Sequence, residues 1–253
     1  MRAGLKTGIV GRELTCLDST TSTQDVAREL ADKGSPDGTV VMALSQQAGR
    51  GRLGRSWFSP EGTLAASIVL KPPLRLLRLL PAISSLAVLR ALKTFRIQAA
   101  IKWPNDVMIR GKKVCGILIE NAFTAGKYDF SVVGIGINVN FDTGRYPEIA
   151  EIATSLSTEL KREVLVSRVA LHLFTELDKL YTRIHNSESI FREWARQMET
   201  LGHTIAVKSG EETIYGMAER LTPEGNLLLR LADGSTREVV AGDVTVLKES
   251  TNK

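Results

Sequence analysis

The sequence lacks an apolar segment long enough to cross a membrane. The longest uncharged apolar stretches, such as residues 79–89, are far shorter than the roughly 20 residues that a membrane-spanning helix needs. The first six residues contain no apolar segment of the kind found in a secretory signal. Mean hydropathy is near zero. We therefore expect a soluble cytoplasmic protein that does not bind membranes.

Cysteine and histidine are also scarce. The two cysteines, Cys16 and Cys115, lie far apart and neither belongs to a Cys-x-x-Cys pair, and the three histidines are scattered. The histidine spacing excludes a histidine-bound metal. Two cysteines could form one disulfide, but a chain of 253 residues can bury a core without a cross-link. We expect two buried thiols, Cys115 above all because it lies in an apolar run.

Positive charge is in excess, but it is concentrated in one place. The formal net charge is +5, and the hexapeptide from Arg50 to Arg55 supplies three arginines and no acid. This distribution indicates a local anion site and not a surface for nucleic acid. Arginine-glycine runs also occur in RNA-binding tails, but those are long and repetitive. A single copy between two predicted strands favours a loop that binds a small anion, and we expect no nucleic-acid partner.

The first two hundred residues alternate between strand-like and helix-like patterns. We expect strands at 14–17, 39–44, 63–70, 100–103, 106–109, 113–120 and 130–140, and helices at 24–32, 81–95, 167–184 and 187–200. Ser22 and Thr23 stand where the N-cap of the first helix belongs. The mixture, with hairpin-like spacing in its middle, predicts an α+β fold in which a mixed sheet carries helices on one face.

The pattern changes from about His203 onwards. Five short strands, at 204–207, 213–220, 227–231, 236–240 and 244–247, are separated by Gly, Pro, Asn and Asp without a helix between them. This arrangement is typical of a small β-barrel. We therefore predict two domains, residues 1–201 and 202–253, with their boundary near Gly202.

Three motifs in the first domain carry polar chemistry. The segment from Gln46 to Pro60 alternates Gly and Arg, so main-chain N–H groups and guanidinium forks could together bind a phosphate. Its glycines would also let it close over a reactive intermediate and exclude water. The simpler interpretation is a flexible solvated loop.

The second motif is Lys102-Trp103-Pro104-Asn105-Asp106, followed by Lys112-Lys113 and by Gly116–Glu120, and the third is Gly134-Ile135-Gly136-Ile137-Asn138-Val139-Asn140. Proline is costly at the entry to a strand because it cannot donate to the ladder. The second motif can still be an Asn-Asp turn between strands. Two glycines two residues apart in a strand indicate the close approach of a backbone or a ligand, or a bulge.

Taken together and in this order, the motifs resemble those of the biotin–protein ligase family over about residues 15 to 247. The matching segments are Ser22-Thr23-Gln24 for its Ser-Thr-Asn element, Gln47 to Trp57 for its adenylate loop, Lys102 to Asp106 for its Lys-Trp-Pro-Asn-Asp motif, Lys113 with Gly116–Leu118 for Lys-x-x-Gly-Ile-Leu, and Gly134 to Asn138 for Gly-x-Gly-x-Asn. Gln24 departs from the usual Asn but keeps an amide. Ser19-Thr20 is a second Ser-Thr pair, and spacing to Gln47 favours Ser22-Thr23.

The resemblance implies a catalytic domain like those of class II aminoacyl-tRNA synthetases and an SH3-like C-terminal domain. It implies an enzyme that forms biotinyl-5'-AMP from biotin and ATP with release of pyrophosphate, then transfers biotin to a lysine of the biotin carrier domain (biotin carboxyl carrier protein) of a carboxylase. Family members are often homodimers. A lipoate–protein ligase of the same fold is the alternative enzyme. A biotin-responsive DNA-binding repressor is the alternative of another class, and about a dozen residues before the first strand leave no room for a helix-turn-helix module.

The resemblance also implies roles for individual residues. Biotin would contact Ser22, Thr23, Gln24, Gln47, Gly49, Arg50, Lys113, Gly116 and Gly134, and the adenylate would contact Arg52, Arg55, Trp57, Lys102, Asn105 and Asn138. Hydroxyls and amides suit the ureido group, while glycines in apolar strands suit the ring and chain. Trp57 would stack on the ligand or anchor the loop in the core.

The predicted catalytic groups are Arg50, Lys113 and Asp106. Arg50 and Lys113, together with Arg52, would neutralise the carboxylate and the α-phosphate, and Asp106 would receive or orient the acceptor ammonium. A Mg²⁺ ion on the nucleotide phosphates would take oxygen ligands from Asp106 and Asn138.

Overall fold

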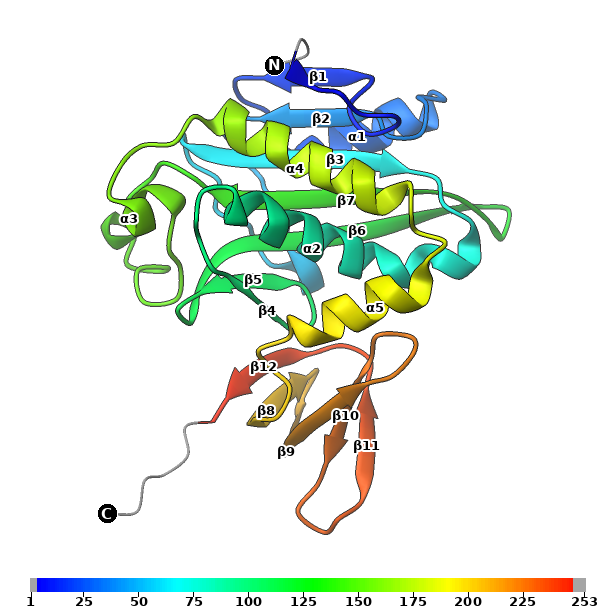
Figure 1. Cartoon of the computed structure of the whole chain (residues 1–253), viewed down its shortest axis with the longest axis vertical. Helices are drawn as coiled ribbons and strands as arrows, with labels where there is room; N and C mark the ends of the chain where they lie inside the picture. Colours follow the sequence, from blue (N-terminus) through cyan, green and yellow to red (C-terminus); the bar gives the residue numbers. More distant parts are fainter. Residues whose placement is uncertain (1–3, 248–253) are drawn as a thin grey trace.

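A seven-stranded mixed sheet organises the first part of the chain (Figure 1). The computed structural model describes residues 4–247. The strand order is β1-β2-β3-β7-β6-β5-β4, and only β1 and β2 run parallel to each other. The strands are β1 (Leu14–Leu17), β2 (Val40–Ala43), β3 (Thr63–Leu70), β4 (Ala100–Lys102), β5 (Asp106–Ile109), β6 (Lys112–Thr124) and β7 (Lys127–Asn138). All seven predicted strands are confirmed, and β6 is longer than predicted because its hairpin with β7 stays paired as far as Thr124 and Lys127.

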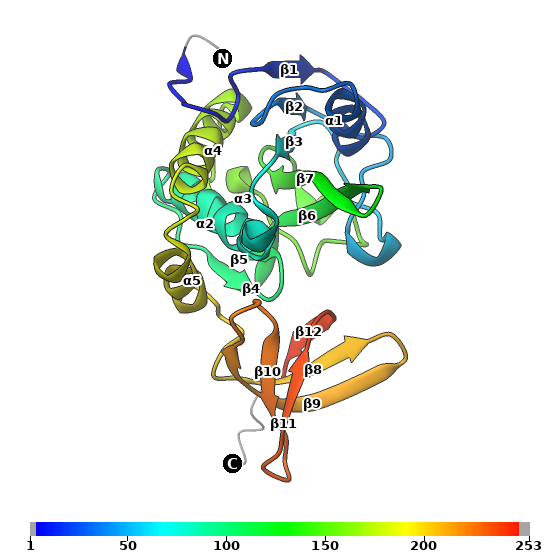
Figure 2. The same ribbon diagram turned by 90° about the vertical axis from the view of Figure 1, so that its right-hand side faces the viewer.

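Long helices cover one face of this sheet: α2 (Leu80–Lys93) and α4 (Val166–Tyr181), with α5 (Ser187–Arg196) against α2. Helix α2 is apolar on nearly all sides because it lies between the sheet and α4. The predicted helices on one face are confirmed for this layer, which is visible at the left of Figure 2.

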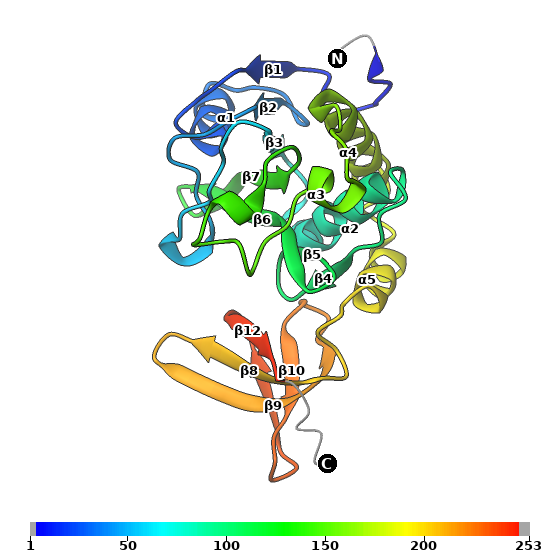
Figure 3. The same ribbon diagram turned by 90° about the vertical axis from the view of Figure 1, so that its left-hand side faces the viewer.

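Helix α1 (Thr23–Asp32) lies on the opposite face, which the prediction of a single helical layer did not include (Figures 2 and 3). Its Ala27 and Ala31 pack against Val41 and Val69, whereas Met42 points to the other side and packs in the core with α2 and α4. The alternation of side chains along a strand separates the two sets. Because α1 is short, much of this second face is left for other segments to cover.

The C-terminal part is a five-stranded antiparallel sheet in the order β11-β10-β9-β8-β12. Its strands are β8 (Thr204–Ser209), β9 (Glu212–Leu221), β10 (Leu227–Arg230), β11 (Thr236–Val239) and β12 (Asp243–Val246). All five predicted strands are confirmed, and the arrangement is consistent with an SH3-like barrel. Gly202, near the predicted boundary, has a φ of 82°, a left-handed conformation that favours glycine.

One hydrophobic core connects the two parts of the chain. Trp103 and Trp194 from the first part belong to the same buried cluster as Leu227 and Leu229 from the C-terminal sheet. The Trp103 indole N–H also donates to the carbonyl of Gly225 at 3.0 Å. The C-terminal sheet is therefore packed firmly against the motif that contains Trp103.

Several short elements were not predicted: the 3₁₀ turns η2 (Arg52–Gly54), η3 (Leu74–Leu79) and η4 (Thr143–Arg145), and the helix α3 (Leu156–Leu160). They are too short to show a helical period. Cys115 is buried as predicted, but Cys16 is exposed on the edge strand β1, and neither forms a disulfide. Among residues 4–247, no helix is both long and apolar enough to span a bilayer.

Candidate active site

A cavity of about 350 Å³ lies on the face of the sheet that also carries α1, within the size range of small-molecule sites. We call it the central pocket. Its floor is formed by β3, β6 and β7, and its walls by the start of α1, residues Arg50–Arg55 (the arginine loop), the turn between β4 and β5, and the start of β12. Segments from both parts of the chain therefore meet around it.

Gln46 caps α1 and lines the central pocket. Its Oε1 accepts the main-chain N–H of Thr23 at 2.8 Å, one of the first N–H groups of the helix, which have no partner within the helix. The N-cap residue itself, Ser22, is 1% exposed and its hydroxyl has no partner in the protein. Ser22 also lines the pocket, so this buried hydroxyl can bind a ligand.

Gln47, the predicted biotin ligand, does not line the central pocket and is exposed. Adjacent residues of an extended chain point in opposite directions. Gln46 is held by isolated bridges to Thr20 and Ser59, so Gln47 faces away. The prediction chose the wrong member of this amide pair as the residue that faces the pocket.

Ser67 on β3 joins the polar groups of α1 to the sheet. Its hydroxyl donates to Gln24 Oε1 at 3.0 Å and lies 2.9 Å from the Thr23 hydroxyl. Gln24 in turn donates to the carbonyl of Val132 at 3.0 Å. A Cβ at Gly134 would lie 2.6 Å from Gln24 Oε1, which explains why glycine occupies that position. Ser67 was missed because a lone serine in an apolar strand carries no sequence signal.

Lys113 and Asp106 form an ion pair at the other end of the central pocket. Lys113 Nζ lies 2.6 Å from Asp106 Oδ1, and both side chains are partly exposed. Lys113 Nζ also lies 5.3 Å from the centre of the Trp57 ring, within the range of a cation–π contact. The main chain of Lys113 is held by Ile152 and Thr154, through hydrogen bonds of 2.8 and 3.0 Å.

The three arginines of the arginine loop contact three different parts of the structure. Arg50 pairs with Asp25 of α1 at 2.6 Å and Glu120 of β6 at 3.5 Å. The hydrogen bond to Asp25 is the main reason why the pKa of Arg50 is raised. Arg55 makes a two-pronged ion pair with Asp243 at the start of β12.

Arg52 points into the central pocket and donates to Asn105 Oδ1 at 3.1 Å. Burial lowers the pKa of Arg52, while the carboxylates of Asp106 and Asp243 oppose that shift. Asn105 is fixed by its own donation to the carbonyl of Ile117 at 2.6 Å. Arg52 is therefore a desolvated cation in a defined position.

Trp57 lies across the two glycines that face it from β6 and β7. A Cβ at Gly136 would be 2.5 Å from Trp57 Cε2, and one at Gly116 would be 2.9 Å from Trp57 Cζ3. The indole N–H is buried and has no partner in the protein. The ring packs on the sheet, as expected of a loop anchor, and it also lines the pocket, so stacking on a ligand stays a prediction.

Three residues that were predicted to bind a ligand do not line the central pocket. Asn138 is 3% exposed, does not line the pocket, and donates to the carbonyls of Thr154 at 3.0 Å and Lys113 at 3.5 Å. Gly49 lies behind Trp57, where a Cβ would be 2.5 Å from the Trp57 carbonyl. With Gln47, these residues lie outside the pocket lining, whereas the structure brings the other predicted site residues together around it.

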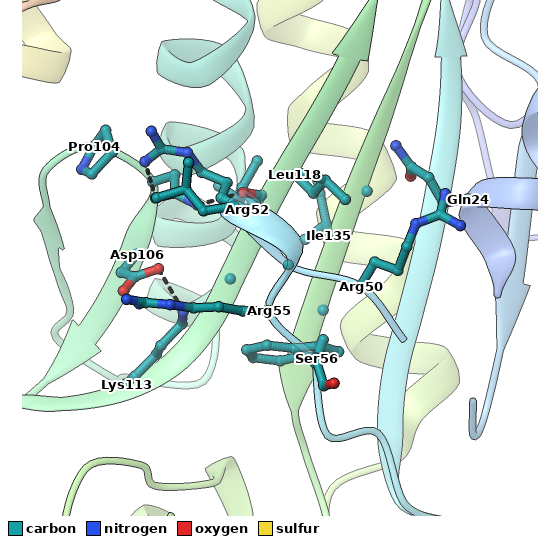
Figure 4. A pocket seen from close by; sticks show the side chains of 18 of the residues that line it. Gln24, Arg50, Arg52, Arg55, Ser56, Pro104, Asp106, Lys113, Leu118 and Ile135 are labelled. Carbon is teal, nitrogen blue, oxygen red and sulfur yellow. Dashed lines mark hydrogen bonds and ion pairs between the residues drawn. The ribbon is translucent and has the colours of Figure 1, made fainter. Parts of the chain in front are cut away.

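Charge divides the central pocket into two ends. The side chains that line it include five cations (Arg50, Arg52, Arg55, Lys102 and Lys113) and two anions (Asp106 and Asp243). In Figure 4, Gln24 lies on one side together with Arg50, whose charge is offset by Asp25 and Glu120, while Asp106 and Lys113 lie on the other side and Leu118 lies between. The pocket therefore suits an elongated ligand with an uncharged hydrogen-bonding head, an apolar middle and an anionic end.

A metal ion would find little support from the protein alone. Within residues 4–247, no three His, Cys, Asp or Glu side chains are grouped so that they could hold one. Asp106 offers a carboxylate at the charged end, and Mg²⁺ commonly takes one or two protein carboxylates with substrate phosphates and water. The residues present thus fit Mg²⁺ only as part of a nucleotide complex.

The fold and the two-ended pocket suit a protein that binds an amphipathic acid beside an anionic partner. Residues 16–138 match the Biotin/lipoate A/B protein ligase family, and residues 200–247 match the Biotin protein ligase C terminal domain. The Bifunctional ligase/repressor BirA of Bacillus subtilis is 36% identical in an alignment of 251 residues that covers 96% of this chain and 77% of that protein. Biotin--[acetyl-CoA-carboxylase] ligase of Mycobacterium tuberculosis is 32% identical over 94% of this chain and 90% of its own length.

Solved structures agree with these matches. Biotin protein ligase from Aquifex aeolicus in complex with biotin and ATP has a TM-score of 0.78 and 30% identity, over 94% of this chain and 99% of its own. The chain belongs to the biotin protein ligase family, as its motifs predicted. The lipoate alternative is not favoured.

Proposed function

We propose that the central pocket catalyses both half-reactions of ATP-dependent biotin–protein ligation. In the first, biotin and ATP form biotinyl-5'-AMP and pyrophosphate; in the second, biotin passes to a lysine of a carrier domain. The observation that carries this proposal is the pairing of a neutral hydrogen-bonding end with a cationic end in one pocket, in a chain of this family.

The neutral end suits the head of biotin. Its ureido group needs donors and acceptors, which the Ser22 hydroxyl, the Gln46 amide and the Thr23 hydroxyl supply. Leu118 would then contact the apolar chain. This orientation directs the carboxylate of biotin towards the charged end, where the reaction would take place.

Arg52 and Lys113 are the groups that we assign to the first half-reaction. A carboxylate oxygen of biotin attacks the α-phosphorus, and the bond from that phosphorus to the pyrophosphate oxygen breaks. Two anions must approach each other, so preorganised cations lower the barrier. Arg50 and Arg55 are already paired with carboxylates on other segments, which favours a role for these two in holding the loop.

Mg²⁺ is the metal that the nucleotide implies. Asp106 is the residue that would hold it, together with phosphate oxygens, and when bound it would neutralise phosphate charge. Asn138 is left out of this assignment, because it does not line the pocket and its amide N–H₂ group is held by two main-chain carbonyls.

Asp106 also has the position to act in the second half-reaction. The acceptor amine attacks the carbonyl carbon of the adenylate, the bond from that carbon to the AMP oxygen breaks, and AMP leaves. A lysine is almost wholly protonated at neutral pH, so a base must take one proton from its ammonium group before attack; the second proton, which the nitrogen loses as the amide forms, passes to the departing AMP phosphate or to water. We assign this role to the Asp106 carboxylate, which Lys113 orients.

An Asp106→Asn enzyme preloaded with biotinyl-adenylate tests this assignment. Transfer to the carrier should slow by roughly a hundredfold or more, the usual contribution of a positioned base. Transfer at the wild-type rate would show that Asp106 is not the base.

Incubation of the chain with ATP, Mg²⁺, biotin and a carrier domain tests the whole proposal. The carrier should gain the mass of one biotinyl group, and lipoate in place of biotin should add nothing. A carrier with its acceptor lysine replaced by arginine is the control. Failure to form biotinyl-adenylate under these conditions would overturn the proposed function.

The remaining expectations stay predictions. They are a catalytic domain of residues 1–201 with a C-terminal domain of 202–253, a carboxylase carrier domain as acceptor, a homodimer, action in the cytoplasm, and no nucleic-acid partner. The name of the Mycobacterium tuberculosis relative supports the acceptor class.

A further inference from the structure

The ion pair between Arg55 and Asp243 joins the arginine loop to the C-terminal sheet. Arg55 Nη1 lies 2.8 Å from Asp243 Oδ1, and Nη2 binds the second carboxylate oxygen. A two-pronged pair of this kind fixes direction as well as distance. The contact links residues 188 positions apart.

The main chain around Asp243 is held by strand pairing and close packing. Asp243 pairs with Lys208 at the beginning of β12, and the preceding residue is packed so closely that a Cβ at Gly242 would lie 2.5 Å from Val207 Cγ1. Gly242, Asp243 and Thr245 also line the central pocket. Strand β12 therefore forms part of the pocket wall and also binds the arginine loop.

Charge holds the arginine loop at its other end too, where Arg50 contacts Asp25 and Glu120. Between the two anchors the loop closes on itself, because the Gly51 N–H donates to the Arg55 carbonyl at 2.7 Å. At its tip Leu53 has 69% of its surface exposed and a φ of 56°. The tip therefore has no apolar anchor, and it is held by the ionic contacts at its two ends together with the Arg52 hydrogen bond to Asn105.

We propose that Asp243 is a positioning residue of the C-terminal sheet that keeps the arginine loop closed over the reaction intermediate. The effect on the adenylate rests on the proposed function, whereas the effect on the loop does not. Arg55 and Asp243 are 64% and 40% exposed, and an exposed ion pair shifts such an equilibrium by no more than about fivefold. Loss of the pair should therefore open the loop several times more often without unfolding the protein.

Limited digestion with trypsin measures loop opening without any need for activity. The loop contains cleavable bonds after Arg50 and Arg52, so its cleavage rate follows the open population. Asp243→Asn should be cleaved there about two to five times faster than wild type, and Asp243→Glu should restore most of the protection. Adding salt should speed cleavage of the wild type more than that of Asp243→Asn, because salt screens exposed pairs.

Glu212→Gln is the matched control. Glu212 forms an equally two-pronged pair with Arg237 inside the C-terminal sheet, at 2.6 Å, and neither residue lines the pocket. This change should leave loop cleavage as it is in the wild type.

A charge exchange separates a direct contact from a general disturbance of the sheet. Arg55→Asp alone should open the loop, and Arg55→Asp combined with Asp243→Arg should close it again, as measured by cleavage after Arg52. In parallel, the Asp243→Asn enzyme should release biotinyl-adenylate two to five times faster than wild type.

Equal cleavage of the Asp243→Asn and wild-type loops would overturn the proposal that the Arg55–Asp243 pair, here called the latch, keeps the loop closed. The absence of recovery in the double variant would overturn it as well. A wild type that forms no adenylate but shows the predicted cleavage pattern would refute the proposed function and leave the latch intact. Faster loop cleavage with unchanged release of adenylate would refute the link between the latch and retention.

Discussion

The indole ring of Trp57 lies against Gly136, in the space that a side chain at that position would need. Trp57 comes from the segment that continues the arginine loop, and Gly136 is in the middle of β7. The contact therefore couples the position of a loop to the surface of the sheet. It also explains in steric terms why the strand carries glycine where β-branched residues would otherwise be preferred.

Gly136→Ala should displace Trp57 and impair adenylate formation by at least tenfold, because an added methyl in a close-packed site costs about 1–3 kcal/mol. The ring can move with its loop, so thermal stability should fall by only a few degrees. Tryptophan emission should shift to the red, a change that reports Trp57 because Trp103 and Trp194 are buried in the core. Gly51→Ala is the control, since its Cβ would be 3.5 Å from the nearest atom; an unshifted spectrum for Gly136→Ala would contradict the contact.

The paired glutamines Gln46 and Gln47 give a prediction with a built-in control. Gln46→Ala should raise KM for biotin roughly 10- to 100-fold, the cost of leaving buried polar groups without a partner. It should also lower stability by about 1 kcal/mol, because Gln46 caps α1. Gln47→Ala, on the exposed side, should change neither quantity. The opposite result in steady-state kinetics would restore the original assignment to Gln47.

These two glutamines also show what sequence could and could not predict. Motif order identified the family, and alternation and turn residues placed all twelve strands, because both depend on residues close together in the chain. Which of Gln46 and Gln47 faces the pocket depends on the bridges of Gln46 to Thr20 and Ser59. These contacts cannot be read from the few residues on either side of the pair. Ser67 likewise becomes polar lining only because α1 folds over β3.

The role of Asp243 was missed for the same reason, because it depends on residues far away in the chain. Nothing in the sequence near Asp243 connects it with Arg55, since the contact arises from packing of the C-terminal sheet beside the Trp103 motif. The prediction that helices cover one face failed to include α1 for a related reason. The amphipathic pattern of α1 shows that one side of the helix is buried. Which face of the sheet the helix covers depends on how the chain connects β1, α1 and β2.

Cysteine labelling tests the burial of the sheet beside Lys113. Burial raises the pKa of the Cys115 thiol far above its ordinary range, so it stays protonated and unreactive at pH 8. Cys16 is exposed. A maleimide should therefore add one group to the native protein and two in denaturant, as counted by mass spectrometry. Rapid labelling of both thiols in the native protein would show that β6 is more accessible than the structure indicates.

Asn138 donates to the main chain of Lys113, and whether it supports Lys113 or binds the metal can be measured. Asn138→Asp would place a carboxylate against the carbonyls of Thr154 and Lys113, so stability should fall by about 3 kcal/mol, which lowers the melting temperature by roughly 6–12 °C. A true Mg²⁺ site would tolerate or gain from the added charge. The Mg²⁺ concentration for half-maximal adenylate formation should stay unchanged in Asn138→Ala and rise in Asp106→Asn. A tenfold rise in Asn138→Ala at wild-type stability would return Asn138 to the metal site.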